Sequence, residues 1–468
     1  MTNKREDNSR IPGGITIRIV KVINPVLLSL VFFITWKLYY YSKTAVPYMW
    51  KGEVVIVGLY FIVYLYLSHL YRGFWIHLNR RAEIIYSQIL SAALTMALMY
   101  LVLILLCKRL PNIFPLLMML AVQIVLILIW TYAADSWYCR VFPRKKTIII
   151  WDERPGLERI IEETGMDSRL DVIGIYHISE VMDNKDELLG PAEWLFMCDL
   201  HSHDRNQLIK YSIEVSKSAY VIPRIGDALM TGADSTHLMH LPILLVRRHP
   251  ASLEYLAVKR LLDVVLSAAG LLVLSPVIAI TAIAIKANDG GDVFYRQDRL
   301  TRDGKVFSIL KFRSMKMNAE KDGVARLSSG EDDDRITPVG RFIRKVRIDE
   351  LPQLINVLKG DMALVGPRPE RPEIAAQYAE TLPEFSLRLQ MKAGVTGYAQ
   401  VYGKYNTTPY DKLLMDLLYT SKASLIEDFR IIIATVKILF MKESTEGVGN
   451  GQTTAASEGF NNTEKKEL

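Results

Sequence analysis

Cysteine is scarce in this chain, with three among 468 residues: Cys107, Cys139 and Cys198. No two of them form a CxxC pair, which excludes a zinc ribbon and a thioredoxin-type redox motif. So few cysteines also exclude a disulfide scaffold. Because half of the residues are hydrophobic, the chain as a whole is neither disordered nor collagen-like.

Charge is ordinary in amount, but hydropathy is not. Charged residues make up 23% of the chain, near the ~25% of a soluble domain. The mean hydropathy is nevertheless positive, at +0.16, so the apolar residues must be concentrated in one part of the chain. The net charge of +7 admits nucleic acid, an anionic bilayer or a phosphorylated small molecule as partner.

Four apolar stretches near the N-terminus each approach the ~20 residues that cross a bilayer. They cover residues 25–41, 54–71, 84–107 and 113–130. Their number disfavours the alternative, buried helices of a soluble protein. Basic residues gather before the first stretch, between the second and third, and after the fourth. By the positive-inside rule, both ends of this bundle are expected in the cytoplasm.

The region after the spans alternates strand-like and helical patterns, which predicts a small parallel α/β domain. The expected strands are "TIIIWD", "DVIGIY", "EWLFMCD" and "YVIPRI". No GxGxxG follows the first of them, so we favour a structural or regulatory spacer over a dinucleotide-binding domain. The run His201-Ser202-His203-Asp204 resembles a metal-ligand cluster, but a solvated loop is the favoured interpretation.

A fifth apolar stretch, residues 261–285, is also long enough to cross a bilayer, but Ser275-Pro276 divides it into two shorter pieces. Proline removes a backbone donor and can bend a helix sharply. Cations flank the stretch on both sides, which predicts that both ends stay cytoplasmic. We therefore expect a re-entrant helix. The alternative, a simple transmembrane helix, would place everything after it outside.

Residues 286–410 combine cations, carboxylates, glycines and prolines. Asp349-Glu350 is predicted to open a short helix, with Asp349 as its N-cap, Pro352 in its first turn and Gly360 just after its end. Taken alone, Asp349 would be no more than a cap. However, a rigid Pro367-Arg368-Pro369 turn follows, and further cations crowd the pair in sequence: Arg341, Arg344, Lys345 and Arg347. Lys311, Arg313 and Lys316 lie close together beside an earlier, strand-like apolar piece.

Cations at a helix N-terminus form an anion site. Two carboxylates in such a site suggest a metal, a nucleophile, or both. Magnesium prefers carboxylates together with substrate phosphate oxygens. The pattern therefore predicts phosphoryl-group chemistry at a membrane surface.

Four segments closely resemble bacterial sugar transferases of the polyprenyl-phosphate hexose-1-phosphate transferase type, which initiate capsule, exopolysaccharide and O-antigen assembly. The segments are "KRLLDVVLSAAGLLVLSP", "KFRSM", "RKVRIDELPQLINVLKGDMALVGPRPE" and "KAGVTGYAQVYGKYNT". The resemblance covers about residues 255–442. The whole layout is similar to the long members of that family, with four spans, a degenerate nucleotide-fold domain and a catalytic unit.

The resemblance implies a role for each matching residue. Asp349 is the nucleophile, and Glu350 is its catalytic partner and the magnesium ligand. The substrate-binding residues are Arg344, Lys311, Arg313 and Arg368, of which Arg368 is associated with the nucleotide-sugar phosphates. Ser275 and Pro276 are the break in the re-entrant helix, and its polar anchors are Lys259, Arg260 and Asp263. Two departures, Ala363 and the run Lys392-Ala393-Gly394, are expected to have small effects.

The implied fold is an integral membrane α-helical bundle plus α/β domains. Its predicted parts are a cytoplasmic segment at 1–24, a transmembrane region at 25–140, a Rossmann-like cytoplasmic domain at 141–250, a mixed α/β catalytic domain with the re-entrant helix at 251–442, and a disordered tail at 443–468. The tail is polar, without periodicity, and rich in Gly, Ser and Thr.

The implied reaction converts a UDP-hexose and undecaprenyl phosphate into undecaprenyl-diphosphate-hexose and UMP, with Mg²⁺ as cofactor. A covalent Asp349 intermediate divides it into two displacements. The expected location is the bacterial cytoplasmic membrane, with the catalytic domain on the cytoplasmic face. The sequence does not identify the sugar, although glucose and galactose lead over an N-acetylated sugar. It also leaves the polysaccharide pathway and the formation of a homodimer open.

Two rival functions remain. A processive membrane glycosyltransferase could use Asp332 and Asp334 as a DxD motif, but no QxxRW follows; it would release UDP instead of UMP. A membrane scaffold or chain-length regulator would leave the Asp349-Glu350 pair unexplained. Nucleic-acid binding is disfavoured because the basic residues are interleaved with membrane segments.

Overall fold

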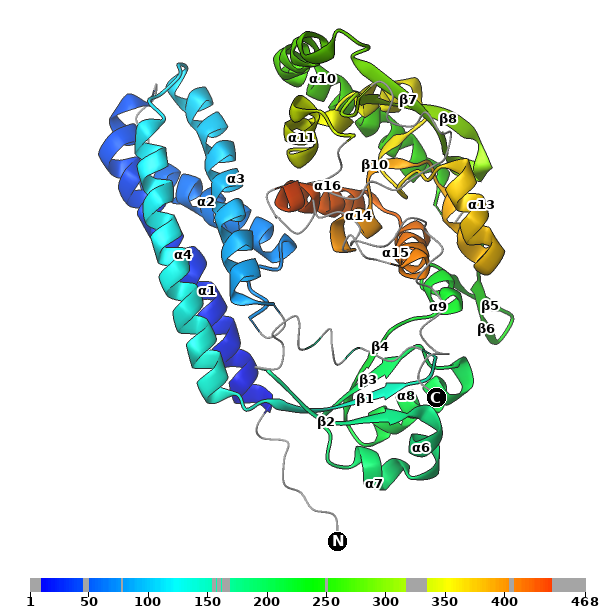
Figure 1. Ribbon diagram of the computed structural model, residues 1–468. Coiled ribbons are helices and arrows are strands. Elements are labelled where there is room, and N and C mark those ends of the chain that lie inside the picture. Colours follow the sequence, from blue (N-terminus) through cyan, green and yellow to red (C-terminus); the bar gives the residue numbers. More distant parts are fainter. Residues whose placement is uncertain are drawn as a thin grey trace. The chain divides into compact units, whose positions relative to one another are not determined.

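The computed structural model describes residues 10–44, 50–76, 79–153, 157, 161, 169–248, 251–316, 335–403 and 408–439. The chain forms two compact units, Met1–Ile222 and Pro223–Leu468 (Figure 1). The predicted disordered tail at 443–468 lies outside the described residues, as does the Asp332/Asp334 pair.

Four long helices open the first unit: α1 (Arg10–Thr35), α2 (Trp50–Leu70), α3 (Arg81–Cys107) and α4 (Phe114–Val141). Two short turns, η1 (Trp36–Tyr40) and η2 (Tyr41–Lys43), extend α1. Each of the four helices is long and apolar enough to cross a membrane. Helix α1 begins well before Pro25, where the first span was expected, and it continues through that proline.

The interior of this bundle is partly polar. Tyr64 donates to Asn24 at 2.8 Å, and Asn24 in turn donates to Gln88 at 3.1 Å. Gln123 donates to the Tyr60 hydroxyl at 2.8 Å. Because hydrocarbon offers no hydrogen-bond partners, buried polar side chains in a membrane bundle must satisfy one another. These bonds therefore fix how the four helices pack.

A parallel sheet of order β2-β1-β3-β4 follows the bundle. Its strands are β1 (Lys145–Trp151), β2 (Leu170–His177), β3 (Trp194–Cys198) and β4 (Ser218–Val221). Helices α6 (Ile178–Asp183), α7 (Lys185–Leu189) and α8 (Ser202–Glu214) connect them, and Ile148, Ile150, Leu195 and Leu208 lie in the core. The first three predicted strands are thus confirmed, whereas the fourth, "YVIPRI", is a strand only at Tyr220 and Val221, and its Ile225 begins α9 (Ile225–Met230).

The run from His201 to Asp204 is not the solvated loop that the sequence suggested. Ser202, His203 and Asp204 form the first turn of α8, and His201 is its N-cap residue. The His203 ring nitrogen pairs with the Gln207 amide at 2.8 Å, one turn along the helix. Within the described residues, no group of three or more His, Cys, Asp or Glu side chains is placed to hold a metal ion.

The second unit contains the remaining elements. They are α9 (Ile225–Met230), β5 (Asp234–Leu238), β6 (Leu241–Leu245), α10 (Leu253–Asp289), β7 (Phe294–Leu300), η4 (Arg302–Gly304), β8 (Val306–Phe312), α11 (Pro338–Lys345), η5 (Ile348–Glu350), α12 (Gln353–Lys359), β9 (Ala363–Val365), α13 (Pro372–Thr381), η6 (Pro383–Gln390), β10 (Gly394–Thr396), α14 (Tyr398–Tyr402), α15 (Pro409–Ser421) and α16 (Leu425–Leu439). Strands β7 and β8 pair antiparallel, and β9 and β10 pair parallel.

Helix α10 is a single 37-residue helix with Pro276 inside it, so the expected division into two pieces is wrong at the level of secondary structure. Proline cannot donate to the carbonyl four residues before it. The hydroxyl of Ser275 donates to that carbonyl, Leu272 O, at 2.8 Å. This bond replaces the missing backbone bond and lets the helix continue. Helix α10 is also long and apolar enough to cross a membrane, and most of its surface is exposed.

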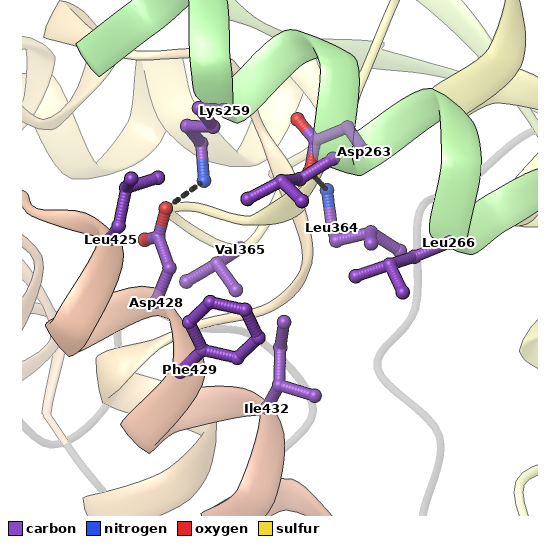
Figure 2. A pocket seen from close by; sticks show the side chains of 10 residues that line it. Lys259, Asp263, Leu266, Leu364, Val365, Leu425, Asp428, Phe429 and Ile432 are labelled. Atoms are coloured by element: carbon purple, nitrogen blue, oxygen red, sulfur yellow. Dashed lines mark hydrogen bonds and ion pairs between the residues drawn. The ribbon is translucent and has the colours of Figure 1, made fainter.

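Three polar side chains at the start of α10 bind three other elements. Lys259 pairs with Asp428 of α16 at 2.8 Å, and Asp263 accepts from the backbone N–H of Leu364 in β9 at 3.1 Å (Figure 2). Arg260 donates to the carbonyls of Val357 and Leu358, at 2.6 and 2.9 Å. Those carbonyls end α12, where a cation is favourable. These three anchors therefore fix the start of α10 to the rest of the second unit.

In the first unit, one buried carboxylate joins the helical bundle to the parallel sheet. Asp135 of α4 is 4% exposed and pairs with Arg81 of α3 and, at 2.7 Å, with Arg169 just before β2. Both arginines therefore depend on a single counter-ion.

We expect Asp135→Asn to lower the free energy of unfolding by ~3–5 kcal/mol, because it leaves Arg169, whose side chain is 8% exposed, without its counter-ion. The measurement is the thermal unfolding midpoint of the full chain in detergent. Glu193→Gln, which removes the exposed pair between Lys145 and Glu193, is the matched control and should cost at most ~1 kcal/mol. Equal midpoints for the two variants would contradict the account.

Candidate functional site

Asp349 and Glu350 lie in η5, a single 3₁₀ turn between α11 and α12. Arg347 precedes the turn in the left-handed region, with φ 55°, and reverses the chain direction there. The predicted N-cap role of Asp349 is wrong, because α12 begins at Gln353 after Pro352. Proline has a fixed φ that suits a helix start, so the helix begins there and not at Asp349. Gly360 closes α12 with φ 95°, as predicted.

Asn356 fixes η5 and α12 against strand β8. This side chain is 3% exposed, accepts from Leu310 N–H at 2.9 Å and donates to Ser308 O at 2.9 Å. The two bonds attach α12 to the strand that carries Lys311. Sequence reasoning missed Asn356, although a lone amide inside the apolar run "LINVL" is a signal that could have found it.

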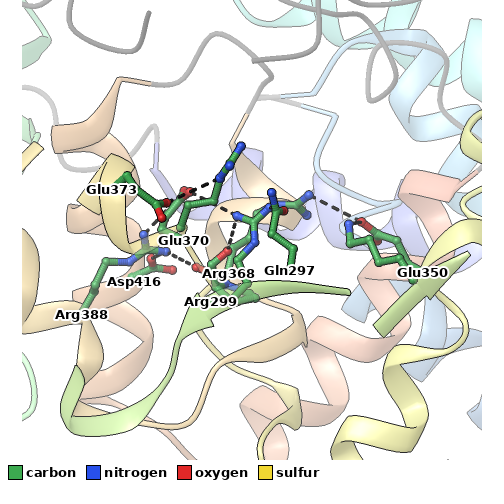
Figure 3. Close-up of polar contacts among 11 residues, drawn as sticks. Gln297, Arg299, Glu350, Arg368, Glu370, Glu373, Arg388 and Asp416 are labelled. Atoms are coloured by element: carbon green, nitrogen blue, oxygen red, sulfur yellow. Dashed lines mark hydrogen bonds and ion pairs between the residues drawn. The ribbon is translucent and has the colours of Figure 1, made fainter. Parts of the chain in front are cut away.

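Glu350 is surrounded by three cations from three different segments. Its carboxylate oxygens lie 3.1 Å from Lys311 Nζ, 3.5 Å from Arg368 Nη2 and 3.9 Å from Arg347 Nη1. The Glu350 side chain is 16% exposed. Figure 3 shows Arg368 directed toward this carboxylate. Strand β8, the left-handed turn and the loop after β9 thus converge on one carboxylate.

The surroundings shift the pKa values of the two adjacent carboxyl groups in opposite directions. Burial, together with the negative charge of Glu350, raises the pKa of Asp349 to about 6, partly offset by Lys311 and Arg344. Burial would also raise the pKa of Glu350, but the charges of Lys311, Arg368 and Arg347 outweigh it and hold that pKa well below its usual range. Two neighbouring carboxyl groups whose pKa values are shifted in opposite directions can take different roles in catalysis. Glu350 is held ionised, and Asp349 is the group closer to neutrality.

The structure brings together most of the substrate-binding residues expected from the sequence. Lys311 and Arg368 contact Glu350. Arg344 lies in the last turn of α11, and its charge lowers the pKa of Asp349. Arg313 follows the end of β8, where its backbone N–H donates to Val293 O at 2.9 Å. Its role in substrate binding stays a prediction.

The carboxylate pair offers the oxygen donors that suit magnesium. Magnesium is usually held by one or two carboxylates, with phosphate oxygens and water as its other ligands. Asp349 and Glu350 are two such carboxylates on adjacent residues, and within the described residues no larger group of ligands accompanies them. The donor set therefore fits an ion that is held jointly with a phosphorylated substrate.

A comparison with protein families gives one match. The model described as "Bacterial sugar transferase" matches residues 254–442, which include α10, the carboxylate pair and the Arg368 turn.

Three curated relatives are similar to parts of this chain. A putative undecaprenyl-phosphate N-acetylgalactosaminyl 1-phosphate transferase of Bacillus subtilis is 46% identical over 29% of this chain and 75% of its own length. A UDP-glucose:undecaprenyl-phosphate glucose-1-phosphate transferase of Caulobacter vibrioides is 40% identical over 40% of this chain and 71% of its own. A galactosyl transferase of Streptococcus agalactiae is 39% identical over 40% of this chain and 43% of its own.

The matches are partial for several relatives. The chain spans about half the length of the Streptococcus agalactiae protein and of an uncharacterized sugar transferase of Haemophilus influenzae, at 43% and 54%.

Proposed function

The chain belongs to the bacterial sugar transferase family, and we propose that it transfers a hexose-1-phosphate from a UDP-sugar to undecaprenyl phosphate, releasing UMP. Relatives with this kind of name support the choice of acceptor. The observation that carries the proposal is the Asp349-Glu350 pair, in which Glu350 forms ion pairs with Lys311, Arg347 and Arg368. A partly buried carboxylate pair flanked by cations suits attack on a phosphate.

The proposed reaction has two displacements at one phosphorus. In the first, a carboxylate oxygen of Asp349 bonds to the β-phosphorus of the UDP-sugar. The bond from that phosphorus to the bridging oxygen breaks, and UMP leaves with the oxygen. In the second, a phosphate oxygen of the lipid attacks the same phosphorus and releases the Asp349 carboxylate. Covalent catalysis of this kind gives ping-pong kinetics.

The three cations around Glu350 differ in their exposure, which separates their roles. The side chains of Lys311, Arg347 and Arg368 are 22%, 30% and 44% exposed, respectively. Arg368 is therefore best placed to bind the diphosphate of the donor, while Lys311 keeps Glu350 ionised. Magnesium, held by Glu350 and substrate oxygens, would add positive charge at the diphosphate when bound.

The names of the relatives point to different sugars: glucose, galactose and N-acetylgalactosamine. UDP-glucose and UDP-galactose are the first donors to test. The reaction is proposed to occur at the cytoplasmic face of the bacterial membrane, with α10 as a re-entrant helix and Ser275-Pro276 at its turning point. The cations that flank this apolar stretch on both sides favour re-entry. The bond from Ser275 satisfies the Leu272 carbonyl that Pro276 leaves free within lipid.

We expect Asp349→Asn to lower UMP release and lipid product by at least about 10³-fold, because an amide is a poor nucleophile. The measurement is UMP release by purified full-length protein from a panel of UDP-sugars with undecaprenyl phosphate. Asp234→Asn, at an exposed carboxylate of the β5–β6 hairpin, is the matched control and should be as active as the wild type. Near-normal turnover by Asp349→Asn would refute the nucleophile assignment, and release of UDP would favour the rival glycosyltransferase.

Glu350→Gln is expected to lose activity together with its response to magnesium, because the amide lacks the charge that a hard cation favours. The rate is measured across a magnesium titration for the wild type and for this variant. Glu384→Gln, at an exposed position, is the control and should keep the wild-type response. If a chelator leaves the wild type fully active, the metal role is wrong.

The re-entrant arrangement of α10 predicts which side of the membrane its C-terminal end reaches. In a variant without the three native cysteines, Asn288→Cys should resist a membrane-impermeant thiol reagent in intact cells. Adding Ser275→Leu and Pro276→Leu removes the features that oppose a straight span, so part of the population should then be labelled and activity should fall. Labelling of Asn288→Cys without those two changes would show that α10 spans the bilayer.

A further inference from the structure

The loop that carries Arg368 has an unusual backbone. It joins β9 to α13, and Pro367 and Pro369 remove two of its N–H groups and fix two of its φ angles. Four successive carbonyls of this loop each accept a hydrogen bond from a different residue elsewhere in the second unit. The pairs are Pro367 O with Gly394 N at 2.9 Å, Arg368 O with Arg388 Nη2 at 2.8 Å, Pro369 O with Arg299 Nη1 at 3.2 Å and Glu370 O with Leu300 N at 3.0 Å.

The donor to Arg368 O is itself a deeply buried charge. Arg388 of η6 is 2% exposed and pairs with Asp416 of α15, which is 1% exposed, at 2.6 Å. Arg388 Nη1 also lies 3.8 Å from Glu370 Oε1. A buried ion pair is a poor source of stability compared with apolar packing. The pair therefore calls for an explanation beyond stability alone.

The two sides of Arg368 face different partners. Its carbonyl is bonded by Arg388, whereas its guanidinium reaches Glu350 at 3.5 Å (Figure 3). The loop has little freedom to shift, because a Cβ added at Gly366 would lie 2.2 Å from Lys392 O. Within this tightly packed loop, the bond from Arg388 is the contact made directly to the residue whose guanidinium reaches Glu350.

We propose that Arg388, oriented by Asp416, is a positioning residue that sets where the Arg368 guanidinium meets the donor diphosphate. This rests on the proposed function, because that function gives Arg368 a diphosphate to bind. Arg388 Nη2 makes both contacts, to Arg368 O and to Asp416 Oδ2, and the planar guanidinium fixes the directions in which the two N–H groups of that nitrogen point. Lysine has a single ammonium on a flexible stem and cannot reproduce this geometry.

A positioning role and a purely structural role of the Arg388–Asp416 pair predict different effects on the reaction. A pair that only joined η6 to α15 would lower stability when broken, and its effect on the reaction would be independent of Arg368. A pair that acts through Arg368 loses its effect once the Arg368 guanidinium is gone. Double-mutant cycles separate these two cases.

The test is a cycle of Arg388→Lys and Arg368→Lys in the full-length protein, measured as kcat/KM for the UDP-sugar by UMP release. We expect Arg388→Lys alone to lower kcat/KM by about 10–100-fold, because small misplacements of a substrate-binding group are costly. In the Arg368→Lys background it should change kcat/KM by less than about twofold. The kcat/KM for undecaprenyl phosphate should be unchanged throughout, because in a ping-pong reaction it reports the second displacement alone.

The matched control is Arg430→Lys, which alters an exposed arginine paired with Glu427 and should have no effect in either background. If Arg388→Lys does not fold, Asp416→Asn takes its place, since it keeps the size of the side chain and removes the charge that orients Arg388. Equal losses in both backgrounds would overturn the positioning role while leaving the proposed function intact. A wild type that releases no UMP from any UDP-sugar would overturn both.

Discussion

The pairing of Glu350 with Lys311, Arg347 and Arg368 is the interaction on which the site depends. Two adjacent carboxylates in a largely buried turn repel each other and lose hydration, so they need compensating positive charge. The three cations come from strand β8, from a left-handed residue and from the loop after β9. Compensating one charge therefore brings β8 and the loop after β9 to the turn that holds Arg347 and Glu350.

The same elements connect the site to the membrane helix. Arg260 of α10 binds the last carbonyls of α12, the helix that directly follows the carboxylate pair, and Asp263 binds the strand that precedes the Arg368 loop. A shift of α10 would therefore move both sides of the site. This coupling suits an enzyme whose acceptor phosphate lies at the membrane surface and whose donor is soluble.

Sequence patterns predicted the features that depend on neighbouring residues alone. The apolar runs, the first three strands of the parallel sheet and the αL glycine after α12 follow from periodicity and backbone preference, and they are confirmed. The run that begins at His201 was misassigned as a loop because its polar composition hid a helix start. The helix start predicted at Asp349 was wrong, because the helix begins at Gln353 after Pro352, whose fixed φ suits that position.

What could not be predicted is which distant residues meet. Nothing near Arg388 in sequence shows that it binds Arg368 O and Asp416, and the amide of Asn356 gives no hint that its partner is β8. Helix α10 illustrates a second limit, because the effect of Pro276 was recognised but the Ser275 bond that maintains the helix depends on side-chain geometry. The residue types at the site were therefore predictable, whereas the contacts that position them were not.

The central claim is that Asp349 carries the phospho-sugar between donor and acceptor. The most direct test is acid-quenched single turnover with UDP-sugar labelled at the β-phosphate, in the absence of undecaprenyl phosphate. The account predicts that label appears on the protein, maps to the peptide containing Asp349, and leaves it for the lipid when undecaprenyl phosphate is added. Transfer of label to lipid with no labelled protein at any time point would show a direct displacement and contradict the account.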